Sequence, residues 1–225
     1  LTGVSRQRRQ GLGFLFAPGE FNLFGENTYI LWNASAEAAI VDPGMADAEE
    51  TSLIEAFISD HALTLKYILL THAHLDHTFG IDHLRERYGT PVLGHKDDAP
   101  LAQMRDDQAR RFHLPVKPGP MEIDRFVDRR SSLNLGHERI EVIETPGHSP
   151  GGVCYYIPES RMVLTGDTLF RGSIGRTDLP GGSMYQLVRS IRERLFLLPD
   201  DTRVYPGHGP ATTIGEEKLH NPYVG

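Results

Sequence analysis

Residues 71–80 read Thr71-His72-Ala73-His74-Leu75-Asp76-His77-Thr78-Phe79-Gly80 and come directly after an apolar run. Three imidazoles and one carboxylate fall within six consecutive positions of this stretch. Neutral imidazole and carboxylate together suit divalent transition metals such as zinc, iron and manganese. The stretch therefore predicts a metal site, placed where a buried strand over residues 65–70 ends.

The spacing inside this stretch predicts that it faces two metal ions. In extended backbone, residues two apart point the same way, so His72 and His74 share one side. Asp76 and His77 begin the turn into a helix predicted over residues 79–88 and point elsewhere. Such a segment fits a site in which two ions lie about 3.5–4 Å apart.

Three later loops also place a polar residue at the end of a predicted strand. Each loop carries one candidate ligand beside glycine or proline: His148 after residues 140–144, Asp167 after 161–164 and His208 after 203–205. Glycine lets the backbone pass close to a metal because no side chain is in the way. Taken alone, each of these three would be a turn residue. With the first cluster they make seven candidate ligands, which suggests two metals rather than one.

Asp42 follows a predicted strand at residues 37–41, in the turn Asp42-Pro43-Gly44. It has two interpretations: an ordinary turn aspartate, or an acid that orients a ligand histidine from outside the metal site. The other histidines lie in no comparable loop, and we expect surface or hydrogen-bonded roles for them: His61, His83, His95, His113, His137 and His220.

The chain alternates short apolar strands with a few helices, predicted over residues 47–59, 79–88, 99–112 and 185–197. Its net charge of -7 argues against sequence-independent binding of nucleic acid or anionic lipid, which needs surplus lysine and arginine. The single cysteine, Cys154, excludes an internal disulfide and fits a reducing compartment. No apolar stretch approaches the roughly 20 residues of a membrane span. We expect one cytoplasmic domain over residues 1–225, with its site between two similar lobes.

The chain resembles the metallo-β-lactamase superfamily through four segments in order: His-Ala-His-Leu-Asp-His at 72–77, Pro-Gly-His-Ser-Pro-Gly at 146–151, Gly-Asp-Thr-Leu-Phe at 166–170 and Pro-Gly-His-Gly-Pro at 206–210. The resemblance implies an αββα sandwich, with two β-sheets packed face to face and helices outside. It also implies two divalent metal ions, with zinc first and iron or manganese as the other candidates. One metal would take His72, His74 and His148, the other Asp76, His77 and His208, with Asp167 bridging them.

Within the superfamily, residues 172–180 and 207–222 resemble the short bacterial glyoxalase II-like hydrolases. Glyoxalase II cleaves the thioester S-D-lactoylglutathione, so the resemblance implies a small acyl thioester substrate of the glutathione type. A hydroxide that bridges the metals would attack the carbonyl, and Asp76 would orient it as a catalytic residue.

The chain also departs from the glyoxalase II pattern. Only 17 residues follow His208, too few for the helical C-terminal domain that holds glutathione in the full-length enzymes. Arg176 and Asp178 stand where those enzymes have a lysine and then a tyrosine. Arg176 could bind a substrate carboxylate through its planar fork, or it could pair with Asp178 and fix the loop.

The alternative function is an iron-dependent glutathione persulfide dioxygenase, which shares Gly-Arg-Thr-Asp at residues 175–178. That resemblance implies a single iron at the positions of His72, His148 and Asp167. β-Lactam hydrolysis is disfavoured because those enzymes lack the bridging aspartate, and RNA processing is disfavoured by the net charge. A non-catalytic metal-binding module is a further alternative, and it predicts that replacing Asp76 changes no activity.

Overall fold

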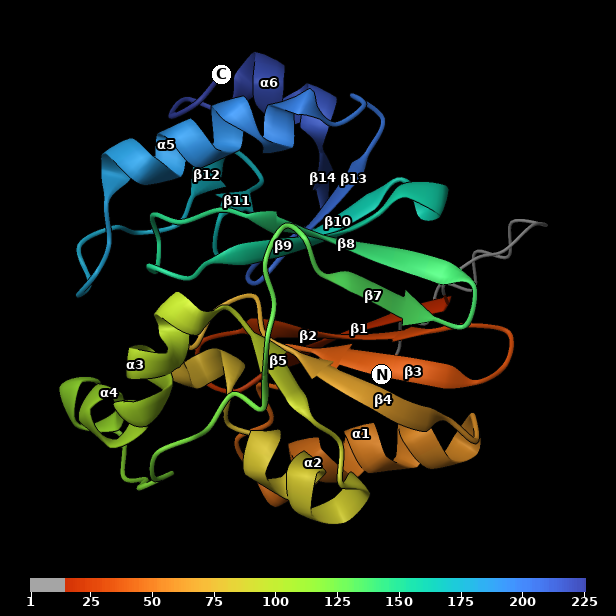
Figure 1. Cartoon of the computed structure of the whole chain (residues 1–225). Helices are drawn as coiled ribbons and strands as arrows, with labels where there is room; N and C mark the ends of the chain where they lie inside the picture. The colour runs from red at the N-terminus through yellow and green to blue at the C-terminus, as the bar shows by residue number, and fades with distance from the viewer. Residues whose placement is uncertain (1–14) are drawn as a thin grey trace.

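Two six-stranded β-sheets lie face to face in the computed structural model, which describes residues 15–225 (Figure 1). The first sheet is antiparallel from its first to its third strand and parallel from its third to its sixth. Its strands follow chain order: β1 (Leu15–Phe21), β2 (Glu26–Trp32), β3 (Glu37–Val41), β4 (Thr64–Leu69), β5 (Val92–Gly94) and β6 (Arg125–Phe126). We call residues 15–126 the first lobe.

The second sheet is built from residues 132–213 and belongs to the second lobe, residues 132–225. Its order is β14 (Thr212–Thr213), β13 (Arg203–Pro206), β10 (Met162–Gly166), β9 (Val153–Ile157), β8 (Glu138–Glu144) and β7 (Ser132–Leu135). β10 and β13 are parallel neighbours, and the other pairs are antiparallel. A separate hairpin, β11 (Leu169–Phe170) with β12 (Ser173–Ile174), follows β10.

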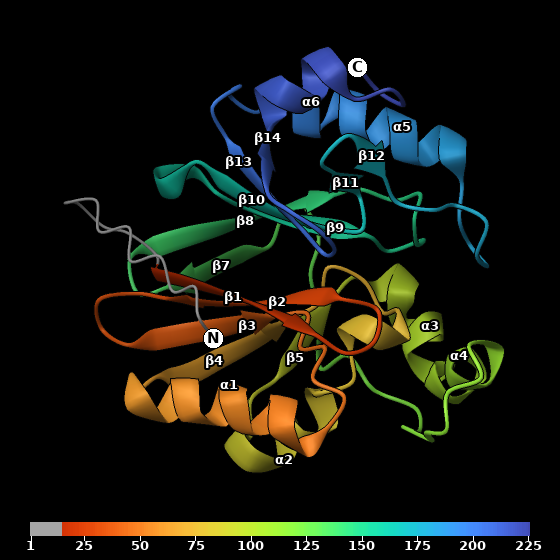
Figure 2. The same cartoon turned by 180° about the vertical axis from the view of Figure 1, so that it is seen from behind.

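Helices cover the outer face of each sheet (Figures 1 and 2). α1 (Ala48–Asp60) and α2 (Ile81–Tyr88) pack on the first sheet, and α5 (Met184–Glu193) and α6 (Ile214–His220) pack on the second. α3 (Ala99–Gln103) and α4 (Arg105–Arg111) lie at one end of the first sheet. No helix within residues 15–225 is long and apolar enough to cross a bilayer.

Strand alternation explains the layers, because successive side chains point to opposite faces of a sheet. On β2, Ile30 packs in a core cluster with α1, whereas Leu31 packs in a second cluster between the two sheets. A third cluster, which includes Leu187 and Ile214, lies under α5 and α6. Three apolar layers between four layers of secondary structure confirm the predicted αββα sandwich.

Two predicted helices are wrong in their extent. The helix predicted over residues 99–112 breaks at Met104, whose φ of -101° and ψ of 23° end α3 before α4 begins at Arg105. The break redirects the chain so that the guanidinium of Arg105 is buried, which a continuous amphipathic pattern does not reveal. The helix predicted over residues 185–197 ends at Glu193, and a 3₁₀ turn, η4 (Leu195–Leu197), follows.

Candidate metal centre

The seven predicted ligands lie in four loops that leave strands of the two facing sheets. His72, His74, Asp76 and His77 follow β4, the last two within the 3₁₀ turn η1 (Leu75–His77). The other three follow strands of the second sheet: His148 after β8, Asp167 after β10 and His208 after β13. The structure brings all seven together.

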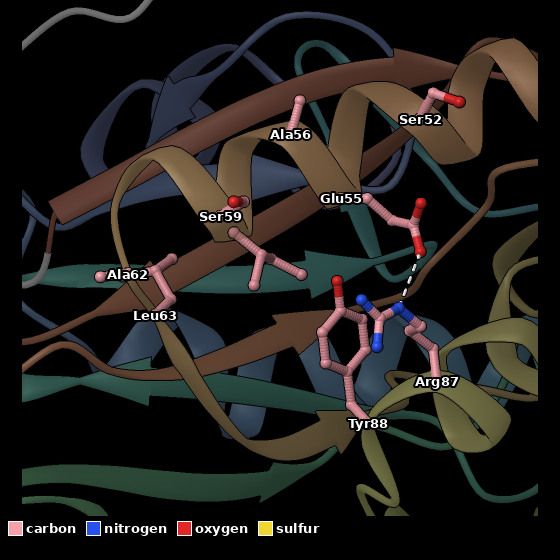
Figure 3. A pocket seen from close by; sticks show the side chains of 9 residues that line it. Ser52, Glu55, Ala56, Ser59, Ala62, Leu63, Arg87 and Tyr88 are labelled. Atoms are coloured by element: carbon pink, nitrogen blue, oxygen red, sulfur yellow. Dashed lines mark ion pairs between the residues drawn. The ribbon is translucent and has the colours of Figure 1, made fainter.

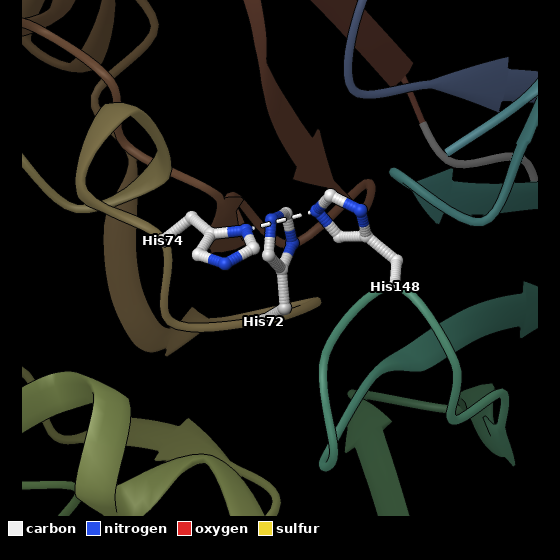
Figure 4. Close-up of side chains that lie close together, drawn as sticks. All are labelled: His72, His74 and His148. Carbon is white, nitrogen blue, oxygen red and sulfur yellow. Dashed lines mark hydrogen bonds between the residues drawn. The ribbon is translucent and has the colours of Figure 1, made fainter. Parts of the chain in front are cut away.

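Three histidines form the first group. The ligand atoms of His72, His74 and His148 all lie within 4.8 Å of one another, and the three residues are buried. Nδ1 of His74 lies 2.9 Å from Nε2 of His148, although the two residues come from different lobes (Figure 4). Three nitrogens at this separation match the donor set of a three-histidine metal site.

Asp76, His77 and His208 form the second group, whose ligand atoms also lie within 4.8 Å of one another. Oδ2 of Asp76 lies 3.3 Å from Nε2 of His208 and 3.6 Å from Nε2 of His77. A mixed set of two imidazoles and one carboxylate suits zinc, iron and manganese alike.

Asp167 lies between the two groups. Its Oδ1 is 3.4 Å from Nε2 of His77 and 3.6 Å from Nε2 of His208, in the second group. Its Oδ2 is 3.5 Å from Nε2 of His148, in the first group. One carboxylate thus presents a different oxygen to each group.

Partners outside the groups set the direction of the histidine rings. Nδ1 of His148 donates to the backbone oxygen of Arg176 at 2.7 Å. Nδ1 of His208 donates to the backbone oxygen of Phe24 at 3.1 Å. A ring nitrogen that donates outward leaves the lone pair of the other nitrogen pointing into the site. These two histidines are therefore held in the tautomer that binds a cation through Nε2.

Asp42 performs the same task for His77, whose Nδ1 lies 3.1 Å from Oδ2 of Asp42. The buried carboxylate also accepts from the backbone N–H and the hydroxyl of Thr71. Because that hydroxyl donates to Asp42, its oxygen accepts from Nδ1 of His72 at 3.0 Å. Of its two interpretations, the contacts favour the one in which Asp42 orients ligand histidines.

Two glycines make room for the ligands. A Cβ on Gly207 would lie 2.4 Å from Oδ1 of Asp167, and one on Gly166 would lie 2.1 Å from the hydroxyl oxygen of Thr71. Gly166 also has a φ of 48°, which side chains other than glycine seldom adopt. Glycine is thus required by close approach at positions 166 and 207, directly before Asp167 and His208.

The donor atoms fit a divalent cation. Nε2 of His72, Nε2 of His77 and Oδ1 of Asp167 are buried and have no hydrogen-bond partner within residues 15–225. Burial lowers the pKa of His74 to about 3 and that of His72 well below its usual value, so both imidazoles keep a lone pair. Burial alone would raise the pKa of Asp167, but His77 and His148 hold it well below its usual range. Burial alone would lower the pKa of His77, but Asp76 and Asp167 raise it well above its usual value, so without a metal His77 carries the positive charge that these buried carboxylates require.

The guanidinium of Arg176 is paired with a neighbouring carboxylate and is not free to bind a substrate. Its Nε and Nη2 each lie 2.7 Å from an oxygen of Asp178, and both side chains are exposed. The loop-fixing interpretation therefore describes this conformation. Sequence reasoning missed the second contribution of Arg176, its backbone oxygen on His148, because no residue pattern marks a carbonyl partner.

The remaining candidates lie elsewhere. His83 pairs with Glu55 at the surface, and Nδ1 of His61 contacts the backbone oxygen of Phe57.

A surface hollow of about 490 Å³ lies between α1 and α2 and carries Glu55, Arg87 and Tyr88 but none of the seven ligands (Figure 3). Burial raises the pKa of the Cys154 thiol to about 12, so it is no nucleophile at neutral pH.

Sequence reasoning also missed several buried polar residues that hold the ligand loops. Glu26 on β2 lies 3.8 Å from Nδ1 of His77, and Asp98 accepts the backbone N–H of Ala73, between two ligand histidines. Neither residue left a signal in the sequence. Only the structure shows that Glu26 is buried on a fully buried strand, and Lys96-Asp97-Asp98 reads as an ordinary charged turn.

Comparisons with known proteins show the family to which this fold belongs. The family profile described as "Metallo-beta-lactamase superfamily" matches residues 22–208. "Hydroxyacylglutathione hydrolase GloC" of Haemophilus influenzae is 38% identical over 89% of this chain and 93% of its own length. The crystal structure of TTHA1623 in a di-iron-bound form is 39% identical, with a TM-score of 0.81 over 92% of this chain and 99% of its own. The crystal structure of BLEG-1 B3 metallo-beta-lactamase is 36% identical, with a TM-score of 0.84 over 93% of this chain and 99% of its own.

Proposed function

The chain belongs to the metallo-beta-lactamase superfamily, and we propose that it is a binuclear metal-dependent hydrolase that cleaves hydroxyacylglutathione-type thioesters. The observation that carries the proposal is the position of Asp167, which turns one oxygen toward each of two complete ligand groups. A mononuclear site would leave Asp76, His77 and His208 gathered around a second space without a use.

The proposed ligand set is His72, His74 and His148 for one ion and Asp76, His77 and His208 for the other, with Asp167 shared. The di-iron form of TTHA1623, at 39% identity, supports two ions of this class here. Zinc remains the first candidate, and iron and manganese bind the same donors.

Two divalent cations in these groups would supply a Lewis acid for the carbonyl and a water of lowered pKa. Asp76 is proposed to orient that water. Burial alone would raise the pKa of its carboxyl, but the neighbouring His77 and His208 lower it, so Asp76 is ionised and can accept a hydrogen bond. A thiolate leaves without a strong proton donor, so the proposed set needs no general acid; because the oriented water would attack the carbonyl, it needs no nucleophilic side chain either.

The thioester substrate rests on the likeness to GloC, whose name describes a hydroxyacylglutathione hydrolase. The chain departs from the glyoxalase II pattern at Arg176 and Asp178, and these two side chains are engaged with each other. We therefore expect S-D-lactoylglutathione to be hydrolysed with a weak KM.

The test is hydrolysis by protein reconstituted with zinc, iron or manganese, with the metal content measured in the same samples. We expect two metals per chain and turnover of S-D-lactoylglutathione at millimolar concentration. Asp76→Asn should lower kcat by about 100-fold, within the range for a positioned proton acceptor. Asp201→Asn, an exposed carboxylate paired with Arg161, serves as the control and should leave kcat unchanged.

Three results would contradict the proposal. Two metals without hydrolysis at millimolar substrate would exclude this thioester. One iron per chain with oxygen uptake on glutathione persulfide would favour the dioxygenase. Efficient cleavage of a β-lactam in preference to the thioester would place the chain with BLEG-1 in activity as well as in fold.

A further inference from the structure

Asp98 lies in the first lobe, at the end of the 3₁₀ turn η2 (Lys96–Asp98), and its side chain is buried. It accepts three hydrogen bonds. Oδ2 accepts from the backbone N–H of Ala73 and from the hydroxyl of Ser149, both at 2.9 Å, and Oδ1 accepts from the backbone N–H of Gly151 at 2.6 Å.

These three donors belong to the two loops that build the three-histidine group. Ala73 stands between His72 and His74 in the first lobe, and Ser149 directly follows His148 in the second. The carboxylate thus connects the two loops across the lobe boundary. Gly151 permits this approach, because a Cβ there would lie 2.6 Å from the backbone nitrogen of Asp98.

The second metal group has a different tie across the same boundary. Nδ2 of Asn27, on β2, donates to the backbone oxygens of Pro206 (3.1 Å) and Gly209 (2.9 Å), on either side of His208. Asn27 touches neither the His148 loop nor Ala73 in the hydrogen bonds of residues 15–225. Each metal group therefore has its second-lobe loop held by buried polar side chains of the first lobe: Asp98 for the His148 loop, and Asn27 together with the hydroxyl of Tyr29 for the His208 loop.

We propose that Asp98 is a positioning residue for the three-histidine group and sets the distance between the His72–His74 segment and His148. This inference rests on the proposed ligand set. The three donors require an acceptor with two oxygens, and asparagine would turn an amide N–H₂ toward at least one of them. Both loops would then separate, because a buried N–H without a partner is unfavourable.

The test compares two isosteric variants, Asp98→Asn and Asn27→Asp, by metal affinity and not by activity. Apoprotein is titrated with zinc against a chromophoric chelator, and anomalous diffraction at the zinc edge gives the occupancy of each group. Asp98→Asn should lower zinc affinity of the three-histidine group about 10–100-fold, as is usual for a partner of metal ligands, and spare the other group. Asn27→Asp should lower the zinc affinity of the group formed by Asp76, His77 and His208 and spare the three-histidine group.

Ser149→Ala keeps Asp98 and removes only one of its donors, so it tests the proposal even if Asp98→Asn folds poorly. We expect a smaller loss of affinity, confined to the three-histidine group. Equal losses in both groups, or a lower melting temperature of the apoprotein with unchanged zinc affinities, would assign Asp98 to general stability and overturn the proposal. Because occupancy is measured without substrate, a wild type that binds two zinc ions but hydrolyses no thioester would contradict the proposed function alone.

Discussion

At the scale of single residues, the ligand side chains are directed by partners that lie outside both metal groups. Asp42 contacts His77 directly and His72 through the hydroxyl of Thr71. Carbonyl oxygens perform the same task for His148 and His208. The site therefore needs correct backbone in four loops as well as seven ligands, because a ring turned by the wrong hydrogen bond presents the wrong nitrogen.

Arg176 allows a prediction at this scale. Its pair with Asp178 is exposed and screened by solvent, so a substrate carboxylate can compete for the guanidinium. Arg176→Ala should raise KM for S-D-lactoylglutathione about 10-fold with kcat nearly unchanged, since uniform binding is lost. Steady-state kinetics with this substrate and with an uncharged thioester will show it.

The matched control is Arg139→Ala, which removes an exposed arginine paired with Glu141 on β8. It should leave both kinetic constants unchanged. If Arg176→Ala raises KM equally for charged and uncharged thioesters, the side chain binds no carboxylate and serves the loop alone.

At the scale of elements, the short helices act as anchors for the ligand loops. Gln108 of α4 accepts the backbone N–H of Leu75 and donates to the backbone oxygen of Ala73, so it holds the first loop from outside. Arg105, also on α4, donates to the backbone oxygen of Thr78. The break at Met104 is thus what turns α4 toward the metal loop.

α6 anchors the β11–β12 hairpin through the buried carboxylate of Glu217, which accepts from the backbone N–H of Gly172 and the side chains of Thr212 and Asn221. Glu217→Ala removes the acceptor of three hydrogen bonds and should lower the free energy of unfolding by about 2–4 kcal/mol. Urea unfolding monitored by circular dichroism measures the change.

Glu216→Ala is the control for this variant, because Glu216 is the preceding residue of the same helix and is exposed. Its effect should stay within about 0.5 kcal/mol, as is usual for surface positions. Equal effects of the two variants would show that the Glu217 contacts do not anchor the hairpin.

At the scale of the whole molecule, each lobe holds ligand loops of the other. The hydroxyl of Tyr155, in the second lobe, donates to the backbone oxygen of Leu70, just before the first metal loop. In the opposite direction, the hydroxyl of Tyr29 donates to the backbone oxygen of Pro206, just before His208. The metal groups therefore span the lobe boundary, and bound metal should stabilise the packing of both lobes.

Metal removal tests this expectation. At free metal about 100-fold above its Kd, each bound ion adds about 2.7 kcal/mol of stability. In a chain of this size 1 kcal/mol shifts Tm by about 2–4 °C, so loss of each ion should lower Tm by about 5–10 °C. Calorimetry before and after chelation, and after zinc is restored, measures the shift.

Asp167→Asn provides the comparison, since it weakens the carboxylate shared by both groups and should reduce the chelator-dependent shift. An unchanged Tm after complete metal removal would contradict a site that links the lobes.

The amino-acid sequence by itself determined the αββα class, and it predicted the candidate ligands and the strand ends at which they stand. These follow from local spacing: alternation places His72 beside His74, and glycine precedes the candidate ligand in each of the three later loops, at positions 147, 166 and 207. Only the tertiary structure decided which partner directs each ring, that Arg176 faces Asp178, and that Asp98 and Asn27 each hold a loop of the other lobe. The contacts of Asp98 and Asn27 with the other lobe join residues 51 to 182 positions apart, and the partners of His148 and His208 are backbone carbonyls; neither kind of contact leaves a periodic signal in the chain.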